Sequence, residues 1–147
     1  MSAFSLRRAT AADVPAMAAL FRRVASATRP LRPDLHTPDE DRVHLLGLVE
    51  TKRVWLAEES GTLAGFIAYG SGLVDHLYVE LGRQARGIGG ALLAQAKLDD
   101  HSLQLWVFQE NVGARRFYER RGFRLVRETD GSGNEEKEPD ALLEWQR

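Results

Sequence analysis

The sequence predicts an α/β fold in which a mixed, mostly antiparallel sheet carries helices on its faces. Short stretches of alternating or consecutive apolar residues indicate strands, and longer stretches with apolar residues every three or four positions indicate helices. Glycine-containing turns join consecutive strands in the middle of the chain, which favours antiparallel pairing, whereas helices flanking a later strand favour crossovers. We expect about seven strands and about four helices in a single domain over residues 1–147.

The composition is that of an ordinary globular protein. With 147 residues the chain can form one domain with a substantial core, and its net charge of −1 provides neither a broad basic face for nucleic acid nor a polybasic anchor. Residues 1–10 lack the apolar core of a signal peptide, and no apolar run is long enough to cross a membrane. The absence of cysteine excludes disulfides, thiolate metal sites and a cysteine nucleophile. We therefore expect a cytoplasmic protein, monomeric or homodimeric, with no metal, nucleic-acid or membrane partner.

Two helices are expected near the start of the chain. Thr10 is a helix-capping residue, and Asp13 is placed to complete a short capping box. Thr37 provides a second cap, and Pro38 stands at the first helical position, where its missing N–H is not needed. The expected elements are a strand over residues 4–8, a helix over 11–25, a proline-containing connector over 29–33 that could fold over a site, and a helix from 38 through 49.

Strands dominate the next part of the chain. Ser60-Gly61 forms a two-residue turn typical of an antiparallel hairpin, and Gly122 is placed to end a short helix capped by Asn111. The polar, acidic residues 129–139 predict a loop. The remaining expected elements are strands over 52–59, 63–69 and 74–79, a helix from 88 to about 99, a strand over 103–108, the short helix after 111, and strands over 123–127 and 142–145.

A basic, glycine-containing turn joins the strand over 74–79 to the helix that begins at Ile88. A helix start presents N–H groups that lack intrahelical partners, so an anion can bind there. Two common nucleotide motifs fail: a P-loop needs Lys and then Ser or Thr where this chain has Ile88 and Gly89, and the dinucleotide fingerprint needs a third glycine where it has Leu92. The turn still predicts a site for the pyrophosphate of a nucleotide-like cofactor.

Two segments together are similar to those of a known family. The first has Gln, two residues, Gly, one residue and Gly, at Gln84, Gly87 and Gly89. The second places Asn111 and Tyr118 seven residues apart, with Gly122-Phe123 after them. Taken with the order of elements, these segments resemble the GCN5-related N-acetyltransferase (GNAT) superfamily.

The resemblance implies acetyl-CoA as the acyl donor and a residue set to bind it. In the family the central strand splays from the next strand, and the pantetheine arm pairs with its backbone; the matching residues here are Leu77, Tyr78 and Val79. The diphosphate is held by the turn and helix start, which here comprise Gln84, Ala85, Arg86, Gly87, Ile88, Gly89 and Gly90. Asn111 would contact the pantetheine or the sulfur besides capping its helix, and Arg83 flanks the turn.

The resemblance also implies direct transfer of the acetyl group to an amine. Tyr118 is the expected general acid for the coenzyme A sulfur, because a phenol is protonated at neutral pH. The amine must lose a proton before it attacks, and His76 titrates in the useful range. Asp75 and His76 point to opposite faces of their strand, so at most one of them faces the site. The further candidates for the base are Glu80, Glu58 and His36.

Several alternatives stay open at the level of sequence. The chain could be a non-catalytic acyl-CoA-binding module of the same fold, although both segments are intact. It could also transfer a different acyl group, such as succinyl or a longer chain. The acceptor, an amine of a small molecule or of a protein, is not identified by any residue pattern.

Overall fold

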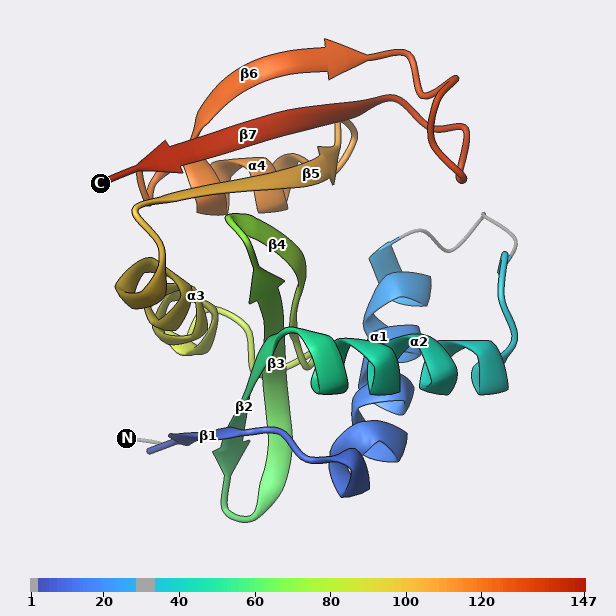
Figure 1. Ribbon diagram of the computed structural model, residues 1–147, viewed down its shortest axis with the longest axis vertical. Coiled ribbons are helices and arrows are strands. Elements are labelled where there is room, and N and C mark those ends of the chain that lie inside the picture. The colour runs from blue at the N-terminus through green and yellow to red at the C-terminus, as the bar shows by residue number, and fades with distance from the viewer. Residues whose placement is uncertain (1–2, 29–33) are drawn as a thin grey trace. The chain divides into compact units, whose positions relative to one another are not determined.

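A computed structural model describes residues 3–28 and 34–147, so the expected connector over 29–33 lies outside the described residues. Within these residues the expected seven strands and four α-helices are confirmed, and Figure 1 shows their arrangement. The elements are β1 (Ser5–Arg8), a 3-10 turn η1 (Ala11–Asp13), α1 (Val14–Thr28), α2 (Pro38–Thr51), β2 (Arg53–Glu59), β3 (Thr62–Gly70), β4 (Leu73–Val79), α3 (Ile88–Asp99), β5 (Ser102–Phe108), α4 (Val112–Glu119), β6 (Arg124–Thr129) and β7 (Asp140–Gln146).

The strands hydrogen-bond in the order β1-β2-β3-β4-β5-β7-β6. β2 pairs antiparallel with β1 and β3, and β7 pairs antiparallel with β5 and β6. The parallel step is between β4 and β5, where Leu73 is opposite Gln104. The mixed, mostly antiparallel sheet that the sequence predicts is therefore confirmed.

The chain packs as two compact units. The first unit comprises residues 1–70 and 74–96, and the second comprises 71–73 and 97–147. The expectation of a single domain stays a prediction. Among the described residues, none of the helices is both long and apolar enough to span a bilayer.

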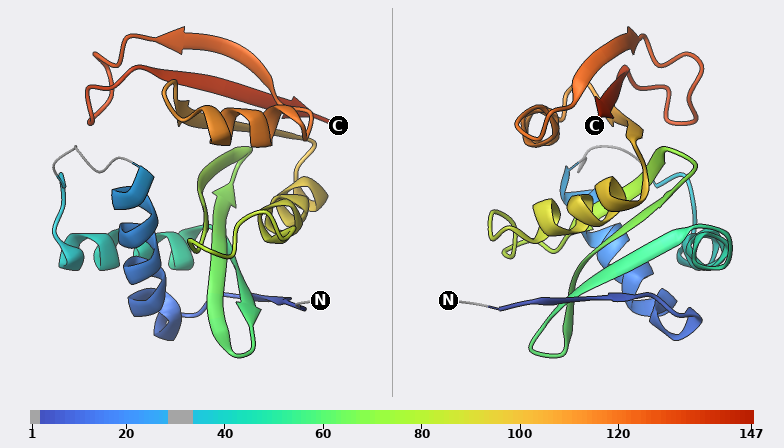
Figure 2. Two further views of the ribbon diagram at one scale, coloured as in Figure 1. Left: turned by 180° about the vertical axis from the view of Figure 1, so that it is seen from behind. Right: turned by 60° about the vertical axis from the view of Figure 1, so that its left-hand side comes forward.

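In the first unit, helices cover both faces of the strands. α1 and α2 lie on one face and α3 lies on the other, as the side view in Figure 2 shows. The core on the α1 and α2 side contains fully buried Met17, Leu20 and Leu45 packed with Phe66 of β3. On the other side Leu92 of α3 approaches Gly65. Leu45 and Leu48 of α2 are buried, whereas Val43 of the same helix is 72% exposed.

The helix starts follow the capping chemistry of the sequence. The Thr37 hydroxyl accepts the N–H of Glu40 at 3.1 Å, and the Glu40 carboxylate accepts the N–H of Thr37 at 2.8 Å, which completes a capping box. The Asp13 carboxylate accepts the N–H of Thr10 at 2.8 Å. Hydrogen bonds from Arg7 lower the pKa of Asp13 to about 2, so this cap stays ionised. This cap precedes a 3-10 turn, η1, which leads directly into α1.

Gly65 of β3 is required by the close approach of β4. A β-carbon at this position would lie 2.7 Å from the Tyr78 carbonyl oxygen and 3.3 Å from the Val79 Cα, both of them backbone atoms. We expect Gly65→Ala to destabilise the protein by about 1–3 kcal/mol, because the strands must separate to admit the methyl group. Thermal unfolding measures this change.

Gly47 provides the matched control for that substitution. It lies inside α2, and a β-carbon there would have no heavy atom within 4 Å. Gly47→Ala should stabilise the protein by about 0.5–1 kcal/mol, since alanine restricts the unfolded chain and favours a helix. Equal effects of the two substitutions would contradict the close strand contact.

The second unit is a three-stranded antiparallel arrangement with α4. Leu103, Leu105 and Val107 of β5 are buried, and Leu143 of β7 is fully buried. The loop over 130–139 is closed by side chains: Asn134 donates to the Glu138 carbonyl oxygen at 2.7 Å and to the Asp140 carboxylate at 3.1 Å. The predicted loop is therefore confirmed, and it is ordered by its own polar groups.

Candidate functional site

The turn between β4 and α3 has the backbone that close approach to a ligand requires. Gly82, Ala85 and Gly87 adopt positive φ angles of 78°, 64° and 85°. Ala85 carries a β-carbon in a region that L-residues rarely occupy, and such strain is concentrated at functional turns. The turn is exposed, and a β-carbon at Gly87 would have no heavy atom within 4 Å. A ligand can therefore approach the backbone here.

The start of α3 supplies donors to this turn. The N–H of Ala91 bonds to the Gly87 carbonyl oxygen at 3.0 Å, so the N–H groups of Ile88, Gly89 and Gly90 precede the first intrahelical bond. The Ile88 side chain is buried and fixes the helix start in the core. The partial positive charge of a helix N-terminus adds to these donors. The arrangement is suited to an anion such as a diphosphate.

Two arginines of the turn are held by a buried carboxylate. Glu59, at the end of β2, is only 4% exposed. Its Oε1 lies 2.7 Å from a terminal nitrogen of Arg83 and 3.6 Å from a terminal nitrogen of Arg86. Glu59 therefore orients the side chains of Arg83 and Arg86 beside the turn. The sequence did not predict this role.

Gln84 and the end of β4 are joined by a side-chain contact. The Gln84 amide nitrogen donates to the Val79 carbonyl oxygen at 3.1 Å. The Glu80 N–H donates to the Ala64 carbonyl oxygen at 2.8 Å, so β3 also holds the end of β4. Leu77, Tyr78 and Val79 are half-buried. The first unit thus places the predicted pantetheine strand and the predicted diphosphate turn in direct succession.

His76 lies on the face of β4 that packs against α1. Its ring centroid is 5.3 Å from that of Phe21 and 5.7 Å from that of Tyr78. Its Nε2 lies 2.9 Å from Nε2 of His44, which extends from α2. Burial among these rings, and then the nearby His44, lower the pKa of His76 to about 4. His76 is therefore neutral at physiological pH, with a lone pair on one ring nitrogen. The expectation that it titrates in the useful range is wrong, because burial disfavours its protonated form.

The other candidates for the base differ from His76 in their surroundings. A terminal guanidinium nitrogen of Arg23, in α1, donates to the Glu80 carboxylate at 2.5 Å. This hydrogen bond lowers the pKa of Glu80. Glu58 pairs with Arg7 at 2.7 Å, and Asp75 lies 3.6 Å from Lys52. His36 is exposed, and its carbonyl oxygen accepts a hydrogen bond from Arg22. Of these residues, His76 combines a neutral ring with a protected position.

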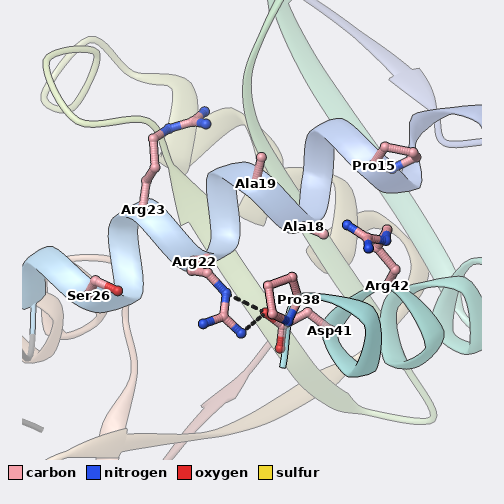
Figure 3. A pocket seen from close by; sticks show the side chains of 9 residues that line it. All are labelled: Pro15, Ala18, Ala19, Arg22, Arg23, Ser26, Pro38, Asp41 and Arg42. Atoms are coloured by element: carbon pink, nitrogen blue, oxygen red, sulfur yellow. Dashed lines mark hydrogen bonds and ion pairs between the residues drawn. The ribbon is translucent and has the colours of Figure 1, made fainter. Parts of the chain in front are cut away.

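A groove of about 530 Å³ runs between α1 and α2 (Figure 3). Its lining residues are Pro15, Ala18, Ala19, Arg22, Arg23 and Ser26 of α1, and Pro38, Asp41 and Arg42 of α2. Two nitrogens of Arg22 donate to one Asp41 oxygen at 3.0 and 2.7 Å, as the dashed lines in Figure 3 show. Asp41 is 6% exposed, so this pair ties the two helices together across the groove.

We expect Arg22→Met to destabilise the protein by about 2–3 kcal/mol, because it leaves the buried Asp41 carboxylate without its guanidinium. Arg42→Met is the control, since Arg42 lines the same groove but pairs with the exposed Asp39. An exposed pair of this kind contributes about 0–1 kcal/mol. Urea unfolding of both variants measures the difference, and equal midpoints would contradict the structural role of Arg22.

The second unit contains the other two predicted site residues, both on α4. The Asn111 side-chain oxygen accepts the N–H of Ala114 at 3.2 Å, which confirms that Asn111 caps the helix. The Tyr118 ring is half-buried and lies 5.1 Å from the Phe117 ring and 5.4 Å from the Phe123 ring, both edge-on. These rings fix the orientation of the phenol within its unit.

Comparison with known proteins identifies the family. Residues 50–125, just over half of the chain, match a family model described as an acetyltransferase (GNAT) domain. The chain belongs to the GNAT acetyltransferase family. The match begins at the end of α2 and includes the turn between β4 and α3 as well as α4 of this GNAT domain.

Two curated relatives carry acetyltransferase names. A protein of Mycobacterium tuberculosis named "Probable N-acetyltransferase Rv2775" is 35% identical over an alignment of 82 residues that covers 49% of this chain and 47% of that protein. The Escherichia coli peptidyl-lysine N-acetyltransferase YiaC is 32% identical over 93 residues, which are 62% of each chain. This GNAT chain thus spans about half to three fifths of the lengths of these relatives.

A solved structure shares the fold over nearly the whole chain. The crystal structure of the PaiA N-acetyltransferase from Thermoplasma acidophilum in complex with coenzyme A has a TM-score of 0.78 and 20% identity, and 99% of each chain is covered. Among the described residues of this GNAT domain, no group of three or more His, Asp or Glu side chains has the arrangement of a metal site.

Sequence reasoning found the turn and its donors but missed the contacts made across the GNAT fold. His44 lies 32 positions before His76, and Glu59 lies 24 positions before Arg83. Their partners are determined by how helices and strands pack, so spacing along the chain gives no signal for them. One weak signal exists: Glu59 ends a strand whose middle, residues 54–57, is apolar, and a charge on such a strand needs a partner when buried.

Proposed function

We propose that this protein transfers an acetyl group from acetyl-CoA to a primary amine. The strand–turn–helix unit of β4 and α3 carries the proposal, because it places the N–H groups of the first turn of α3 next to two arginines held by Glu59. Membership of the GNAT family and the N-acetyltransferase names of both curated relatives support it. The cysteine-free composition agrees with a cytoplasmic location.

The residues of the first unit fit a coenzyme A diphosphate. The donors proposed for it are the backbone of Gln84, Ala85, Arg86, Gly87, Ile88, Gly89 and Gly90, with the side chains of Arg83 and Arg86. A glycine at 87 keeps the approach open, and the buried Glu59 keeps the arginines in place. Leu77, Tyr78 and Val79 would pair through their backbone with the pantetheine arm, which requires that β4 splay from its neighbour.

Catalysis by this chain requires two proton transfers. Bound acetyl-CoA supplies an activated thioester. His76, held neutral in its aromatic surroundings, accepts the proton that the amine must lose. Tyr118 donates the phenolic proton to the departing sulfur, and Asn111 contacts the pantetheine or the sulfur with its amide nitrogen while its oxygen caps α4. The N–H groups of Leu77 to Val79 stabilise the charge on the carbonyl oxygen.

Thiol release with a panel of amines tests the function. The wild-type protein is mixed with acetyl-CoA and, separately, a lysine-containing peptide, a free N-terminal peptide and a polyamine, and free coenzyme A is measured with a disulfide reagent. The lysine peptide is included because YiaC is named a peptidyl-lysine N-acetyltransferase. Amine-dependent thiol release, with acetylated product by mass spectrometry, is the expected result.

Thermal unfolding in the presence of different acyl-CoAs tests which acyl group the protein prefers. At equal ligand concentration, a ligand that binds the folded state more tightly raises the unfolding midpoint more, so acetyl-CoA should raise it more than succinyl-CoA or a long-chain acyl-CoA. A larger shift of the midpoint with another acyl-CoA would indicate that the protein transfers that acyl group and not acetyl. Stabilisation by acetyl-CoA without any amine acetylation would favour a non-catalytic acyl-CoA-binding module.

A further inference from the structure

Two histidines from different elements of the first unit face each other through the same ring atom. Nε2 of His44 in α2 lies 2.9 Å from Nε2 of His76 in β4, and the ring planes stand at 88°. At this distance one nitrogen carries a proton and the other accepts it. The pair therefore shares a single proton, and its two rings are linked as donor and acceptor.

The two rings differ in their access to solvent. His44 is exposed on α2, whereas His76 lies among the rings of Phe21 and Tyr78. Because desolvation opposes a charge on His76, that ring is a poor final site for a proton. His44 can hold the same proton with water around it. A proton that reaches the pair from the protected side should therefore move outward.

Charged side chains near the two histidines form ion pairs with other residues. Arg23 of α1 pairs with Glu80 at 2.5 Å. Asp75, the neighbour of His76 on β4, points to the opposite face of the strand and lies 3.6 Å from Lys52. After desolvation, His44 is the neighbouring group that lowers the pKa of His76. The hydrogen bond between the two Nε2 atoms therefore couples the protons of the two rings.

We propose that His44 and His76 form a proton relay, in which His76 accepts the proton of the acceptor amine and His44 delivers it to solvent. The relay rests on the proposed function, since the amine is the source of the proton. His44 is a positioning and relay residue here, and it acts on the reaction through His76.

His76 begins with a proton on Nε2, donated to Nε2 of His44, and with a lone pair on Nδ1. The N–H bond of the amine breaks as Nδ1 of His76 gains the proton, and the Nε2 proton passes to His44. His44 then loses its own Nδ1 proton to water. After the product leaves, His76 releases its Nδ1 proton to water, the proton on Nε2 of His44 returns to Nε2 of His76, and His44 takes up a proton from water at Nδ1. These steps restore the first tautomers, and the net result is one proton moved from the amine to water.

Variants at the two positions test the relay with the panel amine that the wild type acetylates fastest. His44→Ala should lower kcat at least tenfold and leave the KM for acetyl-CoA unchanged, and imidazole added to the buffer should restore rate at this exposed position. His44→Gln keeps a hydrogen-bonding side chain but cannot carry the proton, so the same loss is expected. His76→Phe with His44→Ala should be no slower than His76→Phe alone, because both residues serve one path.

His101 supplies the matched control, since it is exposed and belongs to the second unit. His101→Ala should keep the wild-type kcat and show no response to imidazole. Full activity of His44→Gln across the pH profile would overturn the relay and leave the proposed function standing. A wild-type protein that binds acetyl-CoA but releases no thiol with any amine would overturn the proposed function, and the relay with it.

Discussion

Tyr118→Phe should lower kcat at least tenfold while the affinity for acetyl-CoA changes little. General acid catalysis contributes about 10²–10⁴-fold, and phenylalanine cannot donate a proton to the leaving sulfur. The ring itself is retained, so the edge-on contacts with Phe117 and Phe123 persist and α4 should fold as before. Steady-state thiol release gives kcat, and calorimetric titration with acetyl-CoA gives the dissociation constant.

Tyr69→Phe is the control for the loss of a phenol. Tyr69 is fully buried in β3, and its hydroxyl lies 3.4 Å from the Gln95 carbonyl oxygen. Removing this hydroxyl should cost about 0.5–1.5 kcal/mol of stability and leave kcat as it is in the wild type. If Tyr118→Phe also retained the wild-type kcat, the role of Tyr118 would be limited to packing between its aromatic neighbours.

The boundaries of most elements were predictable because local chemistry determines them. The Thr37 capping box and the Asn111 cap are formed by side chains that bond to backbone within three residues. At the hairpin after β2, Ser60 and Gly61 adopt the positive φ angles, 51° and 76°, that a two-residue turn requires. In each case the residue and its partner are neighbours in sequence, so the pattern is sufficient.

The predicted diphosphate turn could be found for a similar reason, whereas the base could not be chosen. The turn depends on glycines and a helix start within a few residues. Selecting His76 over Glu80 instead required their distant partners, because Arg23 lies 57 positions from Glu80. Pairing of this kind follows from packing α1 against β4, and only the folded structure shows which carboxylates are neutralised.

Two glycines of the turn allow a final test of cofactor binding by matched substitutions. Gly82 and Gly87 adopt φ angles of 78° and 85°, both are exposed, and a β-carbon at either would meet no heavy atom within 4 Å. Substitution by alanine at either position should therefore lower the free energy of unfolding by a similar amount, about 1–2 kcal/mol, because alanine disfavours the left-handed backbone. The two positions differ in their place relative to the diphosphate donors.

Gly87→Ala should weaken acetyl-CoA binding about tenfold or more, while Gly82→Ala should bind nearly as the wild type does. The reason is that Gly87 immediately precedes the free N–H groups of Ile88 to Gly90, so a methyl group there obstructs the approach of the phosphates. Calorimetric titration with acetyl-CoA and with pantetheine separates a loss of phosphate contacts from a general effect of backbone strain. Pantetheine lacks the diphosphate and should bind both variants alike. Equal losses of acetyl-CoA affinity at the two positions would instead indicate that backbone strain, and not the diphosphate, explains the effect at Gly87.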